Sequence, residues 1–519
     1  MPRLAFKPDS SFFRKIAIGA VGSRAICSDL ANHGHTMVEL ERGSTDTKLW
    51  KDVKRKRVRI PDLVCLQCGV RAESRAKTKP ILAMSHSITD EARAWDFGMV
   101  DSDLIGFPVC EAIDEKYWSS GRLGPESSYW HERNWVRWQL AGCINYFRVG
   151  DFRANPHTKI STKGVTEGSE TSISWDAVFS SRSGIVETIA DRRLTIKRTS
   201  DNHRHTRATP PSMQIFVGQG EEVQMNQVIA GVIKPLTTPD LGCTGILPAD
   251  YIPHLLDSRE RTLRFTGVKL ARLRTEAAYR DTVAELAADD EEDVYIRLEA
   301  LSFLNSVCNE PAAGLFAPYL NSADPQTQLE AVIALGEAGT ADAIQRLSEI
   351  LDNAAQPYFV RSAAAWCLSR AGHQDATRRL LRAFSDIDRN IREEALEGIV
   401  AIGGTATPLL LAGLQELDQD IAAGCAEALR QQRTLPDDAV MQLIEEVRMP
   451  DPSSWLVWLL GHLPRERVAA AIADLQQAAP KLHFAISLLW AFTESWIARR
   501  WELAPGPDFP ASEDNAHGV

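Results

Sequence analysis

A segment that recurs several times in the second half of the chain constrains the fold more than any other sequence feature. Five copies align between residues 294 and 425 on one small residue. The aligned residues, at intervals of 31, 33, 31 and 30, are Ala300, Ala331, Ala364, Ala395 and Cys425. Most copies open after Asp, Asn or Pro, continue with the apolar spacing of an amphipathic helix, and several close at glycine, as at Gly339, Gly372 and Gly403. This period predicts stacked helix pairs, since one pair alone cannot bury its apolar face.

The copies resemble the short HEAT-like repeats found in many bacterial proteins, over residues 285–435. The resemblance implies an α-helical HEAT-like solenoid, a fold that typically offers a long surface to a protein partner. Two apolar helices, 455–460 and 484–492, are too short to span a bilayer, so we expect them to seal its end and extend it to 285–500. Residues 503–519, rich in proline and acids, are predicted to be a disordered tail.

The charge of the chain is divided unevenly along its length. The whole chain of 519 residues has a formal net charge of -11. Residues 1–270 contain 38 Lys and Arg against 31 Asp and Glu, a net of +7, whereas the remainder contains 20 against 38, a net of -18. Phosphate contacts dominate the affinity of nucleic-acid binding proteins. We therefore expect the first half to bind DNA or RNA and the acidic solenoid to bind a protein.

Other features of the composition narrow the class of protein. No run of 18 apolar residues and no signal-peptide pattern is present, which predicts a cytoplasmic protein that does not bind a membrane. The nine cysteines follow no pattern and predict no disulfide framework. Cys65 and Cys68 have the spacing of zinc ligands, but no second such pair follows, and we interpret them as structural thiols.

Residues 165–268 change to short apolar strands separated by glycine turns, which predicts an all-β module. Their order resembles the barrel-sandwich hybrid family, which includes biotinyl and lipoyl carriers. Those carriers hold their cofactor on a lysine at a hairpin tip, and no Met-Lys-Met or equivalent tip lysine lies between Gly184 and Gly220. We therefore expect this module to have a structural role.

Residues 1–160 contain apolar patterns with the period of a helix and others with the period of a strand, which predicts an α/β domain. A helix is expected over 12–31, although Gly19 and Gly22 lower its helix propensity. The expected strands are 37–40, 63–66, 70–77 and 81–84, with the basic run 51–59 before the second and a Gln67-Cys68-Gly69 turn between the second and third. The chain is thus predicted to be multidomain, with an α/β part, an all-β part and a solenoid.

The hairpin at residues 62–77 contains the residues best suited to catalysis. Alternation along a strand puts Glu73, Arg75 and Lys77 on one side, while Asp62 opens the partner strand. Hydrolysis of a phosphodiester needs a divalent cation on oxygen ligands, an acidified water and a nearby positive group. Asp62 and Glu73 are candidates for the first requirement, and Arg75 or Lys77 for the last.

Pro61-Asp62 and Glu73, in this order of elements, resemble the PD-(D/E)XK nuclease superfamily over residues 12–110. The resemblance implies a restriction-endonuclease-like fold, a metal site of Asp62 and Glu73 with Glu39 or Glu41 as an additional acid, and Mg²⁺ or Mn²⁺ as cofactor. The family has lysine two positions after the second acid, where this chain has Arg75. Arginine cannot serve as a base, so Lys77 would have to take that role. The basic residues expected to contact nucleic acid are Lys54, Arg55, Lys56, Arg57 and Arg59.

Three hypotheses for the chain remain open, and the metal-dependent nuclease is the first. The charges of the hairpin are also typical of a solvated ribbon whose side chains pair across its strands. In that case the chain is a noncatalytic HEAT-repeat scaffold with a degenerate nuclease fold. A repeat-type enzyme resembling the phycobilin lyases is the third alternative.

Overall fold

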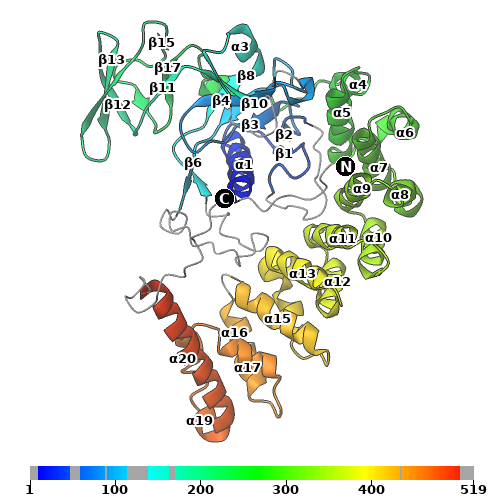
Figure 1. Cartoon of the computed structure of the whole chain (residues 1–519). Coiled ribbons are helices and arrows are strands. Elements are labelled where there is room, and N and C mark those ends of the chain that lie inside the picture. Colours follow the sequence, from blue (N-terminus) through cyan, green and yellow to red (C-terminus); the bar gives the residue numbers. More distant parts are fainter. Residues whose placement is uncertain are drawn as a thin grey trace, which may run out of the picture. The chain divides into compact units, whose positions relative to one another are not determined.

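The computed structural model describes residues 10–46, 59–87, 90–113, 138–162, 170–432 and 435–502. It contains two compact units, Met1–Ala334 and Leu335–Val519. The chain is multidomain: its N-terminal region is a β-rich mixed region with several sheets, and its C-terminal region consists of α-helical HEAT-like repeats (Figure 1). The predicted tail, 503–519, and the basic residues 54–57 lie outside the described ranges.

A five-stranded sheet forms the centre of the N-terminal region. Its strands, in spatial order, are β1 (Met37–Glu39), β2 (Leu63–Cys65), β3 (Arg71–Ser74), β5 (Leu104–Phe107) and β8 (Asn145–Arg148). Strands β3 and β5 are parallel, and the other neighbours are antiparallel. The predicted hairpin is present, with Leu63 opposite Ala72, and Gly69 in its turn has a φ of +76°.

Helix α1 (Ser10–Ala31) covers one face of this sheet (Figure 1). Its residues Ile26 and Leu30 share a buried cluster with Leu63 and Ala72. A Cβ at Gly22 would lie 2.5 Å from the Cβ of Ala76, so glycine lets the helix approach β3 closely. The helix expected over 12–31 is confirmed, and Gly22 supports its packing although it weakens its propensity.

The opposite face of the sheet packs on a second, three-stranded sheet. That sheet has the order β4 (Leu82–Ser87), β10 (Glu170–Trp175) and β9 (Lys159–Thr162). Ile105 and Phe147 of the first sheet are buried together with Met84, Ile173 and Trp175 of the second. The remaining described elements nearby are η1 (Glu91–Arg93), β6 (Cys110–Ala112), β7 (Trp138–Leu140) and α3 (Val149–Ala154).

A β module follows. Its strands are β11 (Ala177–Phe179), β12 (Gly184–Ala190), β13 (Arg193–Arg198), β14 (Arg204–Ala208), β15 (Gln214–Ile215), β16 (Glu222–Val223) and β17 (Val228–Gly231). They form the sheets β14-β13-β12-β16 and β11-β17-β15. The range 165–268, expected to be all β, differs at both ends. Strand β10 pairs with β4 instead, and η3 (Thr238–Leu241), α4 (Tyr251–Leu256) and α5 (Arg261–Leu273) are helical.

The helix pairs begin before residue 285. Helices α5 and α6 (Arg280–Ala288) both contact α7 (Val294–Ser306), so they precede the first predicted repeat as one more pair. Gly267 lies 33 residues before Ala300 and plays the part of the small residue, because a Cβ there would come within 3.0 Å of the Cβ of Leu255 in α4. Because this position is glycine and α5 is a polar helix, the repeat formed by α5 and α6 is not found when the copies are aligned on alanine.

Two buried contacts, one an ion pair and one a hydrogen bond, join the sheet region to this first part of the solenoid. Glu299 of α7 accepts hydrogen bonds from Arg42 Nη2 at 2.5 Å and from Arg272 Nε at 2.6 Å. Its side chain is 0% exposed. Arg71 of β3 donates to the hydroxyl of Thr266 in α5 at 3.3 Å. Both contacts link residues far apart in the sequence, and both are buried.

The repeats have the internal structure that the sequence predicts. The helices after α7 are α8 (Ala312–Leu320), α9 (Pro325–Ala338), α10 (Ala341–Asp352), α11 (Tyr358–Arg370), α12 (Gln374–Arg382), α13 (Arg389–Ile402), α14 (Thr407–Gly413), α15 (Gln419–Gln431) and α16 (Asp437–Val447), with η5 (Ala383–Ser385) and η6 (Gly403–Ala406). All five aligned small residues are completely buried. Asp293, Asp388 and Asp418 cap their helices by accepting backbone N–H groups. Gly339 and Gly372 have positive φ, as expected of helix ends.

The C-terminal helices only partly seal the solenoid. They are α17 (Ser454–Leu460), α18 (Arg465–Val468), α19 (Leu475–Ala478) and α20 (Pro480–Glu502). Ile486 and Trp490 of α20 are buried, whereas Phe484, Leu488 and Phe492 are exposed. Among the described residues, Arg389–Gly413 is long and apolar enough to cross a membrane by length and composition, but it consists of α13 and α14 separated at Gly403.

Candidate functional site

The β2–β3 hairpin places Asp62 and Glu73 on neighbouring strands. The register pairs Leu63 with Ala72, so Asp62 and Glu73 occupy the next opposite positions. Asp62 Oδ2 accepts the backbone N–H of Ser74 at 2.9 Å, which puts its carboxylate beside β3 next to Glu73. Both acids are buried. The structure therefore brings the two predicted acidic residues to one end of one hairpin.

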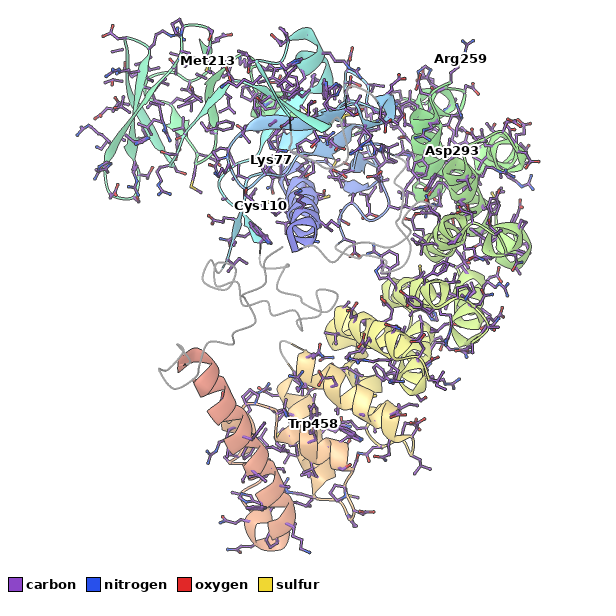
Figure 2. The ribbon with its side chains drawn as sticks, in the orientation of Figure 1. Lys77, Cys110, Met213, Arg259, Asp293 and Trp458 are labelled. Atoms are coloured by element: carbon purple, nitrogen blue, oxygen red, sulfur yellow. The ribbon has the colours of Figure 1, made fainter. Side chains whose placement is uncertain are left out.

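The two predicted cations follow Glu73 along the chain. Arg75 Nη2 lies 3.3 Å from Glu73 Oε1 and also donates to the carbonyl of Trp95 at 2.8 Å. Lys77 lies beyond the end of β3, where its backbone forms an isolated parallel β-bridge with Val109. It is labelled in Figure 2. The arginine that departs from the nuclease pattern is thus in direct contact with Glu73.

Glu39 does not join these acids. It pairs with Leu63, so its side chain leaves the sheet on the α1 face, opposite to that of Glu73. Its carboxylate accepts the N–H of Gly43 at 2.6 Å and the hydroxyl of Thr45 at 2.6 Å. Within the described residues, Asp62, Glu73 and Glu39 do not form a group close enough to share one ion. Glu39 therefore lies apart from the pair formed by Asp62 and Glu73.

Arg59 and Glu41, which have separate predicted roles, contact each other. The backbone N–H of Arg59 donates to Glu41 Oε1 at 2.9 Å, and the Arg59 guanidinium donates to the carbonyl of Ala92. Burial lowers the pKa of Arg59. The other predicted nucleic-acid contacts, Lys54, Arg55, Lys56 and Arg57, lie outside the described residues.

A buried ion pair holds the hairpin in place. Arg71 donates from Nε to Asp103 Oδ1 at 2.9 Å and from Nη2 to Asp103 Oδ2 at 2.6 Å. Asp103 Oδ2 also accepts the N–H of Val100 at 2.8 Å. Bidentate pairing satisfies both charges in an environment that water barely reaches. Strand β3, and with it Glu73, is therefore fixed against the loop that precedes β5.

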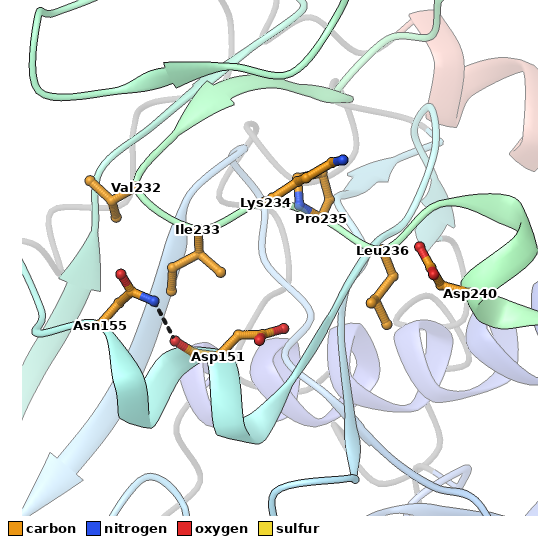
Figure 3. A pocket seen from close by; sticks show the side chains of 8 residues that line it. All are labelled: Asp151, Asn155, Val232, Ile233, Lys234, Pro235, Leu236 and Asp240. Atoms are coloured by element: carbon orange, nitrogen blue, oxygen red, sulfur yellow. Dashed lines mark hydrogen bonds between the residues drawn. The ribbon is translucent and has the colours of Figure 1, made fainter.

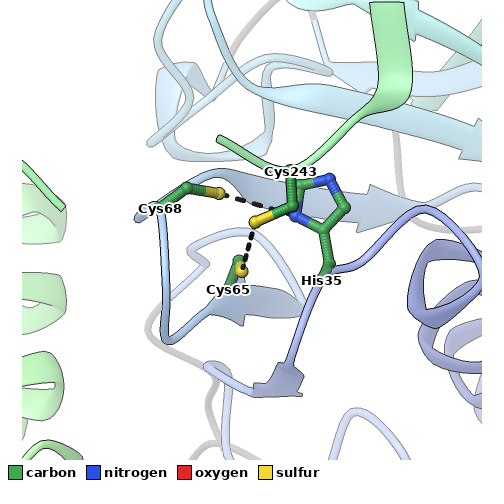
Figure 4. A group of neighbouring side chains, drawn as sticks. All are labelled: His35, Cys65, Cys68 and Cys243. Atoms are coloured by element: carbon green, nitrogen blue, oxygen red, sulfur yellow. Dashed lines mark hydrogen bonds between the residues drawn. The ribbon is translucent and has the colours of Figure 1, made fainter. Parts of the chain in front are cut away.

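The other end of the same hairpin carries a cluster of sulfur and imidazole groups. The ligand atoms of His35, Cys65, Cys68 and Cys243 all lie within 4.8 Å of one another (Figure 4). Cys65 Sγ is 3.9 Å from Cys243 Sγ, and Cys68 Sγ is 3.5 Å from His35 Nδ1. A hydrogen bond from Cys68 lowers the pKa of the Cys65 thiol. The structure thus brings two further potential ligands, His35 and Cys243, to the two cysteines that the sequence analysis interpreted as structural thiols.

Sequence reasoning missed this cluster because its members are far apart. His35 follows α1, the two hairpin cysteines come about 30 residues later, and Cys243 lies beyond the whole β module. The available signal was Cys65-Leu-Gln-Cys68-Gly69, in which the glycine follows the second cysteine and takes a positive φ. A Cβ at Gly69 would lie 2.5 Å from the ring of Tyr251, so this turn also requires glycine for packing.

A separate shallow pocket lies between α3 and the segment 232–240 (Figure 3). Asp151 and Asn155 line one side, and Asn155 donates to the carbonyl of Asp151 at 2.9 Å. Lys234 and Asp240 lie on the other side. None of the predicted catalytic residues lines it, so the pocket does not bear on the hairpin site.

Comparisons with known families identify the repeats. Residues 354–430 match the family model of HEAT repeats, and residues 327–353 match that of the PBS lyase HEAT-like repeat. The C-terminal part of the chain is thus a HEAT-like repeat region, as predicted. No curated protein matches the sequence.

Solved structures resemble the chain at low identity. An engineered protein is 17% identical over 46% of this chain and 76% of its own, with a TM-score of 0.21. Human deoxyhypusine hydroxylase, solved in complex with glycerol, is 17% identical over 47% of this chain and 95% of its own, with a TM-score of 0.19. At these scores neither likeness bears on the function of this chain.

Proposed function

We propose that the N-terminal region is a metal-dependent nuclease and that the acidic solenoid binds a protein partner. The observation that carries the proposal is the position of the two acids on the hairpin. Asp62 immediately precedes β2, and Glu73 lies opposite it on β3. The Asp62 carboxylate accepts a hydrogen bond from the N–H of Ser74. The proposal is supported by the order of α1, β1, the β2–β3 hairpin and β5, which is parallel to β3; among the described residues, only the short 3-10 helix η1 lies where the nuclease resemblance implies a helix before the last strand.

The donor set fits a hard divalent ion. Mg²⁺ is commonly bound through one or two carboxylates and keeps several waters, and Asp62 and Glu73 offer two carboxylates from rigid strands. Glu39 is turned to the other face, so the proposed site has two protein carboxylates. When bound there, Mg²⁺ or Mn²⁺ would acidify a water and neutralise charge on the phosphate.

The side chains around the acids take the remaining roles. Arg75 beside Glu73 carries a permanent positive charge and a planar set of donors, which suits a phosphate oxygen but not proton abstraction. Arg71 and Asp103 hold β3, and with it Glu73, in position. The solenoid, with a net charge of -18 beyond residue 270, repels DNA on average and suits a protein partner.

Arg75 also favours a second candidate function, a noncatalytic HEAT-repeat scaffold. The nuclease pattern has lysine at that position, and here an arginine is already engaged by Glu73 and by the carbonyl of Trp95. Loss of the base would leave a fold that still binds nucleic acid without hydrolysing it. The two candidates differ in one measurable property, which is cleavage.

The test incubates the full-length protein with plasmid, linear and single-stranded DNA and with RNA, in Mg²⁺ or in EDTA. We expect cleavage that needs the metal and falls at least about 100-fold in Asp62→Asn and Glu73→Gln, since each change removes a charged ligand. Glu111→Gln, an exposed acid on β6, is the matched control and should cut like wild type. Binding without cleavage, unchanged by the metal, would support the scaffold instead.

A further inference from the structure

We propose that His35, Cys65, Cys68 and Cys243 bind one Zn²⁺ ion as a closed structural site. This proposal does not depend on the proposed nuclease activity, because it concerns the opposite end of the hairpin. His35 and Cys65 are buried, and Cys68 and Cys243 are partly buried. All four side chains point toward one another in Figure 4.

Two distances between atoms of the cluster match those between the ligands of a tetrahedral zinc ion. Zn–S bonds of about 2.3 Å and Zn–N bonds of about 2.0 Å place two sulfurs about 3.8 Å apart and a sulfur and a nitrogen about 3.5 Å apart. The observed separations are 3.9 Å for Cys65 Sγ to Cys243 Sγ and 3.5 Å for Cys68 Sγ to His35 Nδ1. A disulfide would need about 2.05 Å, so the sulfurs are spaced as ligands of a common ion.

A backbone N–H group faces one of the sulfurs. Cys243 Sγ accepts a hydrogen bond from the N–H of Gly245 at 3.3 Å. Such a bond stabilises the negative charge that a metal-bound sulfur carries.

The hydrogen bond of His35 fixes its ring for metal binding. Nε2 lies 2.9 Å from the carbonyl oxygen of Leu241, which can only accept, so Nε2 carries the hydrogen. Nδ1 is then the nitrogen with a lone pair, and it faces the sulfurs. A ligating histidine usually donates its other N–H to a carbonyl or carboxylate, and this contact supplies that second interaction.

Four protein ligands leave no open position, which identifies a structural rather than a catalytic ion. The ion would tie together the end of α1, the β2–β3 turn and the segment that returns from the β module. Tyr251 strengthens the same junction, because its hydroxyl donates to the carbonyl of Gly69 at 3.0 Å. The path of the chain into α4 and α5 would then be set by the metal.

The experiment measures zinc in the full-length protein, purified without chelator and titrated with Zn²⁺. We expect one equivalent per chain, released in step with modification of three thiols by a mercurial reagent. Cys65→Ser and Cys243→Ser should weaken zinc binding at least about 100-fold, more than loss of an outer hydrogen bond would. Cys308→Ser, which removes a cysteine outside the cluster, should bind like wild type. His35→Cys keeps four ligands and should retain the ion.

Co²⁺ in place of zinc gives an independent measurement on the wild-type protein. We expect the absorption of a tetrahedral cobalt–thiolate centre, changed in His35→Cys as nitrogen is replaced by sulfur. If the serine variants do not fold, the wild-type stoichiometry and this spectrum still decide the matter. Wild-type protein that takes up no zinc, zinc that binds equally in Cys65→Ser, or a Cys65–Cys243 disulfide in place of the metal would overturn the proposal.

Discussion

Replacing Glu299 by glutamine is expected to loosen the junction between the sheet region and the first helices of the solenoid. The Glu299 carboxylate contacts the guanidinium groups of both Arg42 and Arg272, whose side chains are 3% and 7% exposed. Glutamine has nearly the same shape as glutamate but no charge. The NH2 group of its amide would face a guanidinium group, and both groups are hydrogen-bond donors. Two buried cations would then lose their shared counter-ion.

The size of the effect follows from the burial. Two hydrogen bonds to a charged acceptor, at 2.5 and 2.6 Å, contribute about 1.5–3 kcal/mol each. Breaking a buried ion pair by removing one partner typically costs about 3–5 kcal/mol. We expect a loss of about 3–5 kcal/mol in the free energy of opening of α7. The exposed pair of Arg280 and Glu310 is the matched control, and Glu310→Gln should cost less than about 1 kcal/mol.

Hydrogen exchange of the α7 amides, followed by mass spectrometry, measures this opening directly. Glu299→Gln should speed exchange by about two to four orders of magnitude, since each tenfold change corresponds to about 1.4 kcal/mol. Replacing all three residues, by Arg42→Met, Glu299→Leu and Arg272→Met, should restore most of the protection, because an apolar triad has no unpaired charge. Exchange in Glu299→Gln that matches Glu310→Gln would refute the reasoning.

Two further predictions concern α1. Gly22→Val should lower the free energy of unfolding by about 1–3 kcal/mol in a denaturant titration, because the new side chain would clash with Ala76. Gly19→Ala adds a methyl group in open space and should be neutral or stabilising. Equal losses in the two variants would contradict the packing argument. Burial, together with the nearby carboxylates of Glu39 and Asp62, raises the pKa of Cys27 to about 11, so its alkylation rate should climb with pH up to about that value, and a plateau near pH 9 would disprove it.

The repeats were predictable because their signal is local and recurs. Ala300 and its four equivalents are small for the same reason in each copy, and all are completely buried. The pair α5–α6 escaped because Gly267 takes the place of alanine within a helix rich in charge. The hairpin was also predictable, since alternation and the Gln67-Cys68-Gly69 turn are encoded in adjacent residues.

The cluster around Cys65 was not predictable in the same way. Its fourth member, Cys243, comes after seven strands of the β module, and no local pattern marks it as a partner of the hairpin. The side of the sheet on which Glu39 emerges was equally hidden, because it depends on the register with Leu63 and not on the type of residue. Long-range register and chain return are decided by tertiary packing.

The contact of α5 and α6 with α7 has a practical consequence for dissecting this chain. A fragment cut at residue 285, where the alanine pattern begins, would remove α5, divide α6 and expose the apolar side of α7 to water. Arg42 and Arg272 would both be removed, so Glu299 would lose the two counter-ions described above. A fragment of the solenoid that keeps the native structure of α7 therefore has to begin before Tyr251. It also has to include the N-terminal sheet region that contacts α4, α5 and α7.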